Sequence, residues 1–199
     1  LLMPSLFIVW LVNPGESYEK TWHNVGFLAA DEFAKEFGEG EWRDQPKFQA
    51  LTQEARLVTF PVLLAKPQTY MNDSGKSIRK LVDFYKLNPA TQLLVVSDDI
   101  DLPLGDVRFR KSGGPGTYNG LKSIVETLGE GFARLRLGLG QPENGEDLAA
   151  WVLSVPSAKE TEVLRKVLRS LPDKVREFVL NASDEEAASD NESNSAKSE

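Results

Sequence analysis

The sequence predicts an α/β fold, in which a mixed β-sheet is covered by helices. Short apolar runs such as Leu6–Val12 alternate along the chain with amphipathic stretches such as Val25–Phe37, a pattern that is typical of this class. A length of 199 residues is most simply one domain with a substantial buried core. Hydrophobic residues make up 41% of the chain and charged residues 27%, as in ordinary globular proteins.

The strand candidates are short apolar runs bounded by turn residues. The first, Leu6–Val12, is apolar enough to resemble a signal peptide, but no basic segment precedes it. It is also too short to cross a bilayer, which takes about 20 apolar residues, so we expect a buried strand and no membrane association. The other candidates are Phe48–Leu51, Leu57–Phe60, Val62–Ala65, Leu93–Ser97, Asp106–Arg110 and Leu135–Leu139.

The helix candidates carry their apolar residues on one face. Val25–Phe37 and Asn119–Leu128 are two of them. A further helix begins at Ser157, and we expect Pro172 to kink or break it because proline removes a backbone hydrogen bond. In the stretch "SGKSIRKLVDFYKL", helical spacing is shown by Ile78, Leu81, Val82 and Tyr85.

An acidic segment, "SDEEAASDNESNSAKSE", ends the sequence. Its six acids and one base give a net charge of −5, which leaves −2 of the total of −7 on the rest of the chain. The segment lacks aromatic and branched aliphatic residues, so it cannot bury enough apolar surface to offset the entropy of ordering. We therefore expect one folded domain over residues 1–182 and an acidic disordered tail over residues 183–199.

The composition excludes several kinds of site. The chain has no cysteine and one histidine, so it holds no disulfide, no thiolate nucleophile and no structural zinc site of the usual ligand set. These absences agree with a reducing, cytosolic environment. Catalysis near neutral pH would have to depend on His23 or on carboxylates.

Polar stretches lie where strands end or helices begin. In open α/β sheets, ligands bind beyond the carboxyl ends of the strands. The strand Leu6–Val12 delivers Asn13 to that edge, and the strand Leu93–Ser97 delivers Asp98. His23 follows Asn13 by ten residues and precedes a helix, so its loop can fold over the same edge of the sheet. The four stretches are "NPG" (13–15), "TYMNDSG" (69–75), "SDDIDLPLG" (97–105) and "KSGGPGTYNG" (111–120).

These residue types suit hydrolysis of an activated acyl bond. A neutral imidazole can take a proton from water if a carboxylate fixes its tautomer, and Asp98 is the best candidate for that carboxylate beside His23. The amides of Asn13 and Asn72 cannot act as bases, but they can orient peptide groups and steady an oxyanion. The sequence has no serine elbow and no cysteine for a covalent intermediate.

Structural roles compete with each of these interpretations. A lone histidine beside a helix start is commonly structural, and Asp73 or Ser74 could simply cap the helix that follows. The acids of "DDID" (98–101) could bind Mg²⁺, although alternation along a strand would point neighbouring acids to opposite faces. The glycine loop "GGPG" (113–116) could bind a phosphate or serve as a connection.

Five stretches together resemble the bacterial-type peptidyl-tRNA hydrolase family in order and spacing. They are "NPGESYEKTWHNVGF", "KPQTYMNDSG", "SDDIDLPLG", "YNGLKSI" and "FARLRLGLG", and the similarity runs from about Phe7 to Val179. The resemblance implies a single α/β domain with a twisted mixed, mostly parallel β-sheet flanked by helices. It also implies hydrolysis of the ester that joins a peptide to the 3′-terminal ribose of tRNA, which recycles tRNA from stalled translation.

The resemblance also implies roles for particular residues. His23 would be the general base that activates water, and Asp98 would orient it and raise its basicity. The reaction would need no metal and no cofactor. The substrate-binding residues would be Asn13, Tyr18, Asn24, Met71, Asn72, Tyr118 and Asn119.

The partner would be peptidyl-tRNA, bound mainly through its phosphates rather than its bases. Basic residues that flank the glycine loop, or lie near it in the sequence, could form one basic face; the alternative is that they are scattered and solvated. We expect a cytoplasmic monomer. The residues of the expected basic face are Arg108, Arg110, Lys111, Lys122, Arg134 and Arg136.

Three departures from the family pattern keep other functions open. Trp10 stands where the family usually has glycine, Tyr118 where it has a second histidine, and Trp22, which could stack on a base, where it has arginine. The main alternative is therefore an RNA-binding protein on the same scaffold with little or no hydrolase activity, as in plant organelle splicing factors that resemble this family. A metal-dependent phosphatase that uses the acids at 98–101 is a third hypothesis.

Overall fold

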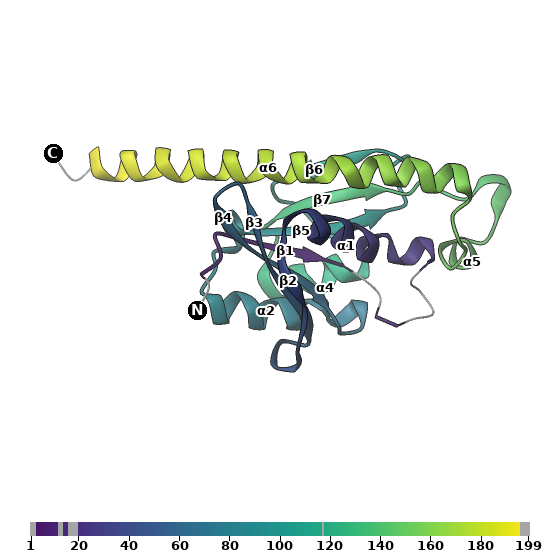
Figure 1. The fold of residues 1–199 in the computed structure, drawn as a ribbon, viewed down its shortest axis with the longest axis horizontal. Coiled ribbons are helices and arrows are strands. Elements are labelled where there is room, and N and C mark those ends of the chain that lie inside the picture. The colour runs from purple at the N-terminus through teal and green to yellow at the C-terminus, as the bar shows by residue number, and fades with distance from the viewer. Residues whose placement is uncertain (1–2, 12–13, 16–19, 117, 196–199) are drawn as a thin grey trace.

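One seven-stranded sheet runs through the centre of the computed structural model, which describes residues 3–11, 14–15, 20–116 and 118–195 (Figure 1). The order of the strands is β2-β3-β4-β1-β5-β7-β6. Their bounds are β1 (Leu6–Trp10), β2 (Gly38–Gln45), β3 (Ala50–Leu57), β4 (Phe60–Pro67), β5 (Leu93–Asp99), β6 (Val107–Arg110) and β7 (Ala133–Gly138).

The sheet is mixed, as the sequence predicts. The four central strands β4, β1, β5 and β7 run parallel to one another, and the pairings toward both edges, β2–β3, β3–β4 and β6–β7, are antiparallel. The two kinds of pairing are therefore equally numerous, so the expectation of a mostly parallel sheet holds for the centre alone. Antiparallel pairing needs only a short connection, and the β3–β4 hairpin supplies one.

The hairpin corrects one of the expected strands. Leu57 pairs with Phe60, so the segment Leu57–Phe60 is a tight turn between β3 and β4 rather than a strand. Val58 in this turn has a φ of 58° and is 57% exposed, and its apolar side chain is what suggested a strand. The sequence analysis missed β2. Most residues of this strand are exposed, so its sequence does not alternate between apolar and polar residues.

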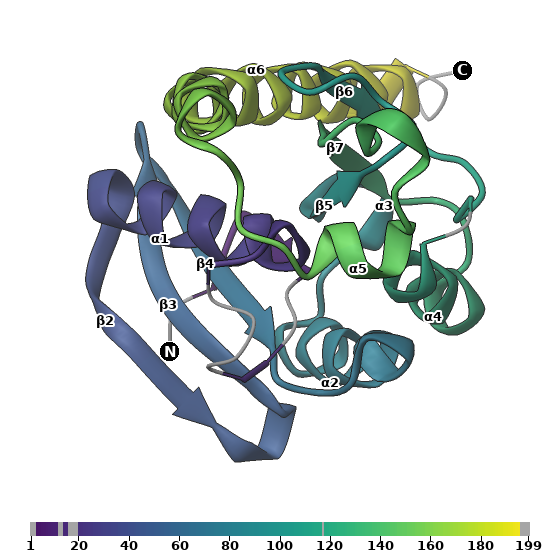
Figure 2. The ribbon, with the colours of Figure 1, turned by 90° about the vertical axis from the view of Figure 1, so that its right-hand side faces the viewer.

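Helices cover both faces of the sheet (Figure 2). The helices α1 (Val25–Phe37) and α6 (Ala158–Ser195) pack on one face, and α2 (Ser74–Tyr85) and α4 (Asn119–Leu128) pack on the other. The central strand β1 serves both layers, because successive side chains of a strand point to opposite faces. The two shorter helices are α3 (Pro89–Gln92) and α5 (Leu148–Val152).

Trp10 is accommodated in the layer between the sheet and α1. Its side chain is fully buried, and its ring lies 5.6 Å from that of Phe33. Ala29 and Ala30 of α1 belong to the same buried cluster. Small side chains on the helix therefore leave the space that an indole needs, while β1 keeps its regular pairing with β4 and β5.

Helix α6 is continuous through Pro172, so the expected break does not occur. Pro172 is itself buried, and its neighbours Leu171 and Val175 belong to the core. This packing offsets the lost hydrogen bond, which costs about 3 kcal/mol in an exposed helix. None of the described helices is both long and apolar enough to span a membrane.

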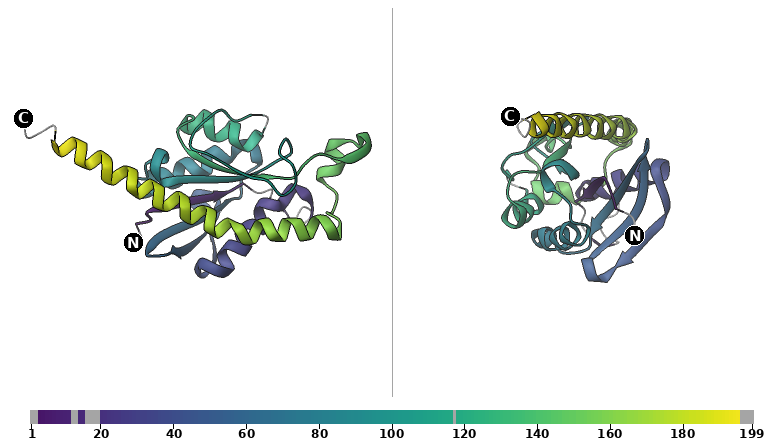
Figure 3. Two further views of the ribbon diagram at one scale, coloured as in Figure 1. Left: turned by 90° about the horizontal axis from the view of Figure 1, so that it is seen from above. Right: turned by 90° about the vertical axis from the view of Figure 1, so that its left-hand side faces the viewer.

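The helix also continues to Ser195, so it includes most of the segment for which the sequence predicts disorder. Alanine and glutamate are good helix formers, and the preceding turns of α6 supply the nucleus that an isolated segment would lack. The far end of α6 projects beyond the body of the protein (Figures 1 and 3). A domain boundary at residue 182 stays a prediction.

Candidate active site

His23 and Asp98 line one pocket. The pocket has a volume of about 630 Å³ and lies beyond the carboxyl end of β5. Its walls come from the 3-10 turn η2 (Trp22–Asn24), the end of β5, the start of α4, the turn η4 (Met71–Asp73) and the short helix α5. The two residues expected to carry the chemistry are thus brought to one place, although 75 positions separate them in the sequence.

His23 lies just before the N-terminal end of helix α1. It is the middle residue of η2, which leads directly into α1 at Val25. The side chain is half-buried, and this burial lowers the pKa of His23 below its usual value. The imidazole is therefore neutral near pH 7 and can accept a proton.

Asp98 extends from the end of β5 into the pocket. The hydroxyl of Tyr118 donates a hydrogen bond to its Oδ1 over 2.6 Å. Burial raises the pKa of Asp98 to about 6, and the hydrogen bond from Tyr118 opposes this rise. Burial, together with the charge of Asp98, raises the pKa of Tyr118 well above its usual value, so the phenol stays protonated.

Close packing of α4 against η4 and α2 fixes the position of Tyr118. The backbone N–H of Gly75 donates to Oγ of Ser123 over 2.9 Å, which joins α2 to α4. A side chain at Gly120 would overlap Sδ of Met71 and press against the ring of Tyr118. Gly120 is thus a site residue that the sequence analysis missed, and Met71 and Tyr118 both line the pocket.

Arg134 is wrongly assigned to the expected basic face. Its side chain is only 2% exposed, and its guanidinium donates hydrogen bonds to the carbonyl groups of Gly113, Gly114 and Glu130. It also stacks on Phe132, at 4.3 Å from the ring centre. Arg134 therefore holds the glycine loop that leads to Tyr118, and it has no free surface to offer a phosphate.

The other residues of the expected basic face are more accessible. In the antiparallel pairing of β6 with β7, Arg108 lies opposite Arg136 and Arg110 lies opposite Arg134, so the four arginines share one face of the sheet. Arg136 is engaged with Asp99, with 2.5 Å between Nη2 and Oδ2. The exposed members of the set are Arg108, Arg110, Lys111 and Lys122.

The expected substrate-binding residues fall into three groups. Asn119, like Met71 and Tyr118, lines the pocket. Asn24 is only 1% exposed and Asn72 of η4 is exposed, and neither is among the residues that line the pocket. Asn13 and Tyr18 lie outside the residues that the structure describes.

Helix α5 forms a wall of the pocket that the sequence did not suggest. It is five residues long, too short to show a helical period, and it contributes Leu148, Ala149 and Val152. It is attached to η2 through Trp22, whose ring stacks on Trp151 of α5 at 4.9 Å. Trp22 is 1% exposed, so the expectation that it could stack on a base is wrong.

The acids at positions 98–101 have separate surroundings. Asp98 contacts Tyr118, whereas Asp99 pairs with Arg136 and accepts the backbone N–H of Asp101. Within the part of the chain that the structure describes, no three histidine or acidic side chains are grouped to hold a metal ion.

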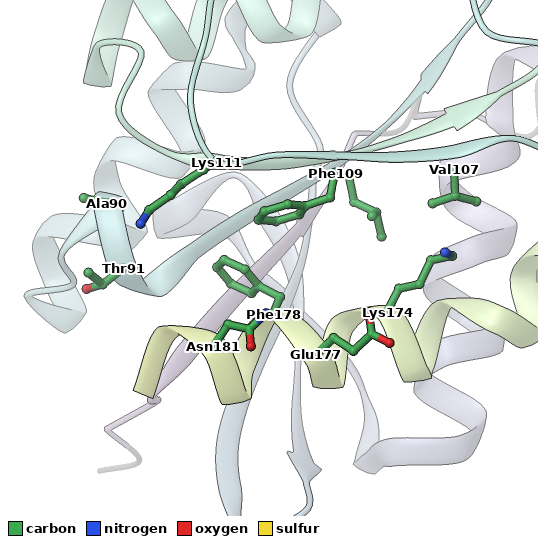
Figure 4. A pocket seen from close by; sticks show the side chains of 10 residues that line it. Ala90, Thr91, Val107, Phe109, Lys111, Lys174, Glu177, Phe178 and Asn181 are labelled. Carbon is green, nitrogen blue, oxygen red and sulfur yellow. The ribbon is translucent and has the colours of Figure 1, made fainter. Parts of the chain in front are cut away.

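A second cavity, of about 260 Å³, lies between α6 and the sheet edge (Figure 4). Phe109 of β6 and Phe178 of α6 face each other there, with their ring centres 5.4 Å apart. The cavity shares no lining residue with the pocket that contains His23. It contains no histidine and is not the candidate active site.

Comparison with known proteins agrees with this arrangement. A family model described as peptidyl-tRNA hydrolase matches residues 7–199. The chain is 44% identical to the peptidyl-tRNA hydrolase of Aquifex aeolicus over 170 residues, which are 84% of this chain and 86% of that protein. It is 46% identical to the enzyme of Desulfitobacterium hafniense over 162 residues, which are 81% of this chain and 85% of that protein. The chain belongs to the peptidyl-tRNA hydrolase family.

Solved structures support the same assignment. The crystal structure of peptidyl-tRNA hydrolase from Acinetobacter baumannii superposes with a TM-score of 0.82 at 32% identity, covering 93% of this chain and 94% of that one. In this member of the peptidyl-tRNA hydrolase family, two aromatic residues lie at or near the pocket. Trp22 forms a buried stack with Trp151, and the hydroxyl of Tyr118 donates a hydrogen bond to Asp98.

Proposed function

We propose that this protein hydrolyses the ester between peptide and tRNA in peptidyl-tRNA and so recycles tRNA from stalled translation. The observation that carries the proposal is that His23 and Asp98 line the same pocket. The relatives that this chain matches over most of their length are named for the same activity. The alternative, an RNA-binding protein without hydrolysis, is not favoured because the expected base and its carboxylate are both retained.

In the proposed mechanism, neutral His23 takes a proton from a water molecule as the water oxygen attacks the ester carbonyl carbon. Asp98 stabilises the imidazolium that forms. The tetrahedral intermediate collapses, the bond from carbonyl carbon to ribose oxygen breaks, and His23 returns the proton to that oxygen. The amides of Asn13, Asn72 and Asn119 orient the substrate or its oxyanion, and no covalent enzyme intermediate and no metal is involved.

The remaining roles follow the same proposal. Met71 packs against the peptide or the terminal adenosine, and Tyr18 and Tyr118 also contact substrate. Asn24, which is buried, supports the turn η2 that carries His23. The protein acts as a cytoplasmic monomer and binds phosphates of the tRNA through Arg108, Arg110, Lys111, Lys122 and, where it is not engaged with Asp99, Arg136.

The decisive experiment is peptide release from peptidyl-tRNA by the purified protein and by His23→Ala. Because a general base contributes about 10²–10⁴-fold, we expect the variant to lose activity by that factor. His23 is half-buried at a turn, so the melting temperature and the affinity for tRNA should change little. Undiminished release by His23→Ala would contradict the mechanism, and tRNA binding without release by the wild type would favour the RNA-binding alternative.

A further inference from the structure

Tyr118 and Asp98 form a contact between two elements that are distant along the chain. Tyr118 occupies the N-cap position of α4, and Asp98 lies near the end of β5. The 2.6 Å separation of the phenol oxygen and Oδ1 is short for a hydrogen bond between side chains. The ring has little freedom, because it packs over Gly120 together with Met71. The phenol is therefore aimed at the carboxylate before any substrate binds.

The chemical consequence follows from what each group can donate. A protonated phenol donates one hydrogen bond, and an ionised carboxylate only accepts. A donor favours the charged form of a carboxylate, whereas burial favours the protonated form. Tyr118 occupies Oδ1, so Oδ2 keeps its lone pairs for a second donor, and the N–H of an imidazole is such a donor.

Several other charged or titratable groups face Asp98 from the walls of the pocket. They are His23 from η2, Asp99 and Asp101 from the end of β5 and the turn after it, Arg136 from β7, and Asp147 next to α5. Arg136 is paired with Asp99, so its charge is largely compensated. The charge of Asp99 further raises the pKa of Asp98. Tyr118 is thus the side-chain donor, within the described pocket, that counteracts burial.

We propose that Tyr118 is a positioning residue, whose hydroxyl orients the Asp98 carboxylate and keeps it ionised for its interaction with His23. The phenol then sets the lower end of the pH range in which the enzyme works. A histidine at this position would change charge near neutral pH, whereas this phenol does not. The inference rests on the proposed function, because the consequence for activity assumes that His23 is the general base.

The test is the pH profile of kcat/KM for peptide release by the full-length wild type and by Tyr118→Phe, from pH 5 to pH 8. Removing a hydrogen bond to a charged group should raise the midpoint of the fall in activity at low pH by about one pH unit. The activity of Tyr118→Phe relative to the wild type should then be about tenfold lower at pH 5 than at pH 8. Tyr85→Phe, which removes a phenol on α2 outside the pocket, should follow the wild-type profile.

A measurement that does not depend on activity separates this inference from the proposed function. The Asp98 carboxyl carbon can be titrated by ¹³C NMR in the wild type and in Tyr118→Phe. We expect its midpoint to rise by about one pH unit in the variant. An unchanged midpoint with a parallel pH profile would overturn the role of Tyr118. Absence of peptide release by the wild type would overturn the proposed function, while the NMR midpoint would still decide the inference.

Discussion

Two adjacent acids at the end of β5 show how strongly local surroundings decide what a residue does. Asp99 is buried against Arg136, with 2.5 Å between the charged atoms, and it completes the turn after the strand through Asp101. Asp98 faces the pocket and contacts the neutral phenol of Tyr118. Asp99 therefore has a structural role, whereas the charge of Asp98, which lines the same pocket as His23, is not compensated by a cation among the described residues.

That uncompensated charge costs stability. Burial raises the pKa of Asp98 from 3.8 to about 6, so the folded protein binds the proton more tightly than the unfolded chain does. The protonated form of Asp98 is favoured by folding, so its contribution to the free energy of unfolding is full below about pH 4. This contribution is lost as the pH rises through 6. The difference corresponds to about 3 kcal/mol as an upper limit, because the side chain keeps some contact with water.

Asp98→Asn should therefore increase the free energy of unfolding at pH 7 by about 1–3 kcal/mol while lowering peptide release. Urea unfolding of both proteins at pH 5 and pH 7 checks this. The wild type should gain stability relative to Asp98→Asn as the pH falls from 7 to 5. An equal free energy of unfolding for both proteins at each pH would contradict the burial of this charge.

The sequence predicted His23 and Asp98 because they are the sole histidine and a strand-end carboxylate. It could not predict the contact of Asp98 with Tyr118, since that depends on how α4 docks against β5. Arg134 was misplaced for a related reason. Arginine is usually exposed, and only the path of the glycine loop, which passes over β7, shows that its guanidinium is covered.

At the scale of elements, the pocket depends on α5 being held against η2. The helix is five residues long, and helices of this length are not stable by themselves in water. Its position is secured by the Trp22–Trp151 stack and by the N–H of Trp22, which donates to the carbonyl of Ser154 over 3.2 Å. One wall of the pocket is thus anchored mainly by a pair of indoles.

Trp151→Ala should loosen this wall. We expect KM for peptidyl-tRNA to rise several-fold, with a smaller fall in kcat because His23 and Asp98 keep their own supports. The loss of a partly buried ring and of an aromatic pair should lower the free energy of unfolding by about 2 kcal/mol. Steady-state kinetics and urea unfolding measure both effects. Leu153→Ala, an exposed site on the same segment, is the matched control and should change neither.

The elements that the sequence predicted best are those with a clear periodic pattern. The bounds of α1 and α4 agree with the predicted helices Val25–Phe37 and Asn119–Leu128, since each buries one face. The missed elements are β2, which is mostly exposed, and α5, which is shorter than two helical turns. A periodic pattern of apolar residues arises when one face of an element is buried, and neither β2 nor α5 has such a buried face.

At the scale of the whole molecule, two buried clusters on opposite faces of one sheet hold the protein together. The last buried residue of α6 in these clusters is Val179. The segment 183–199 has no aromatic or branched aliphatic residue to add to either cluster. From the sequence, we therefore expect the helical continuation of α6 to contribute little apolar burial to the fold.

Deletion of residues 183–199 should accordingly leave the melting temperature within about two degrees of the wild type, because little apolar area is lost. Calorimetry or circular dichroism of the shortened protein checks this. A fall of ten degrees would mean that the segment docks on the body. Tighter and more salt-sensitive binding of RNA after the deletion would indicate that the acids repel RNA in the intact protein.

The direction in which α6 leaves the body has a consequence for long-range electrostatics. At a rise of about 1.5 Å per residue, the helix carries its end some 24 Å beyond Val179, and it points away from α5 (Figure 1), which forms one wall of the pocket. The Debye length in physiological salt is about 8 Å. We therefore expect an anionic substrate that enters the pocket to be screened from the charge of the acidic segment at the helix end.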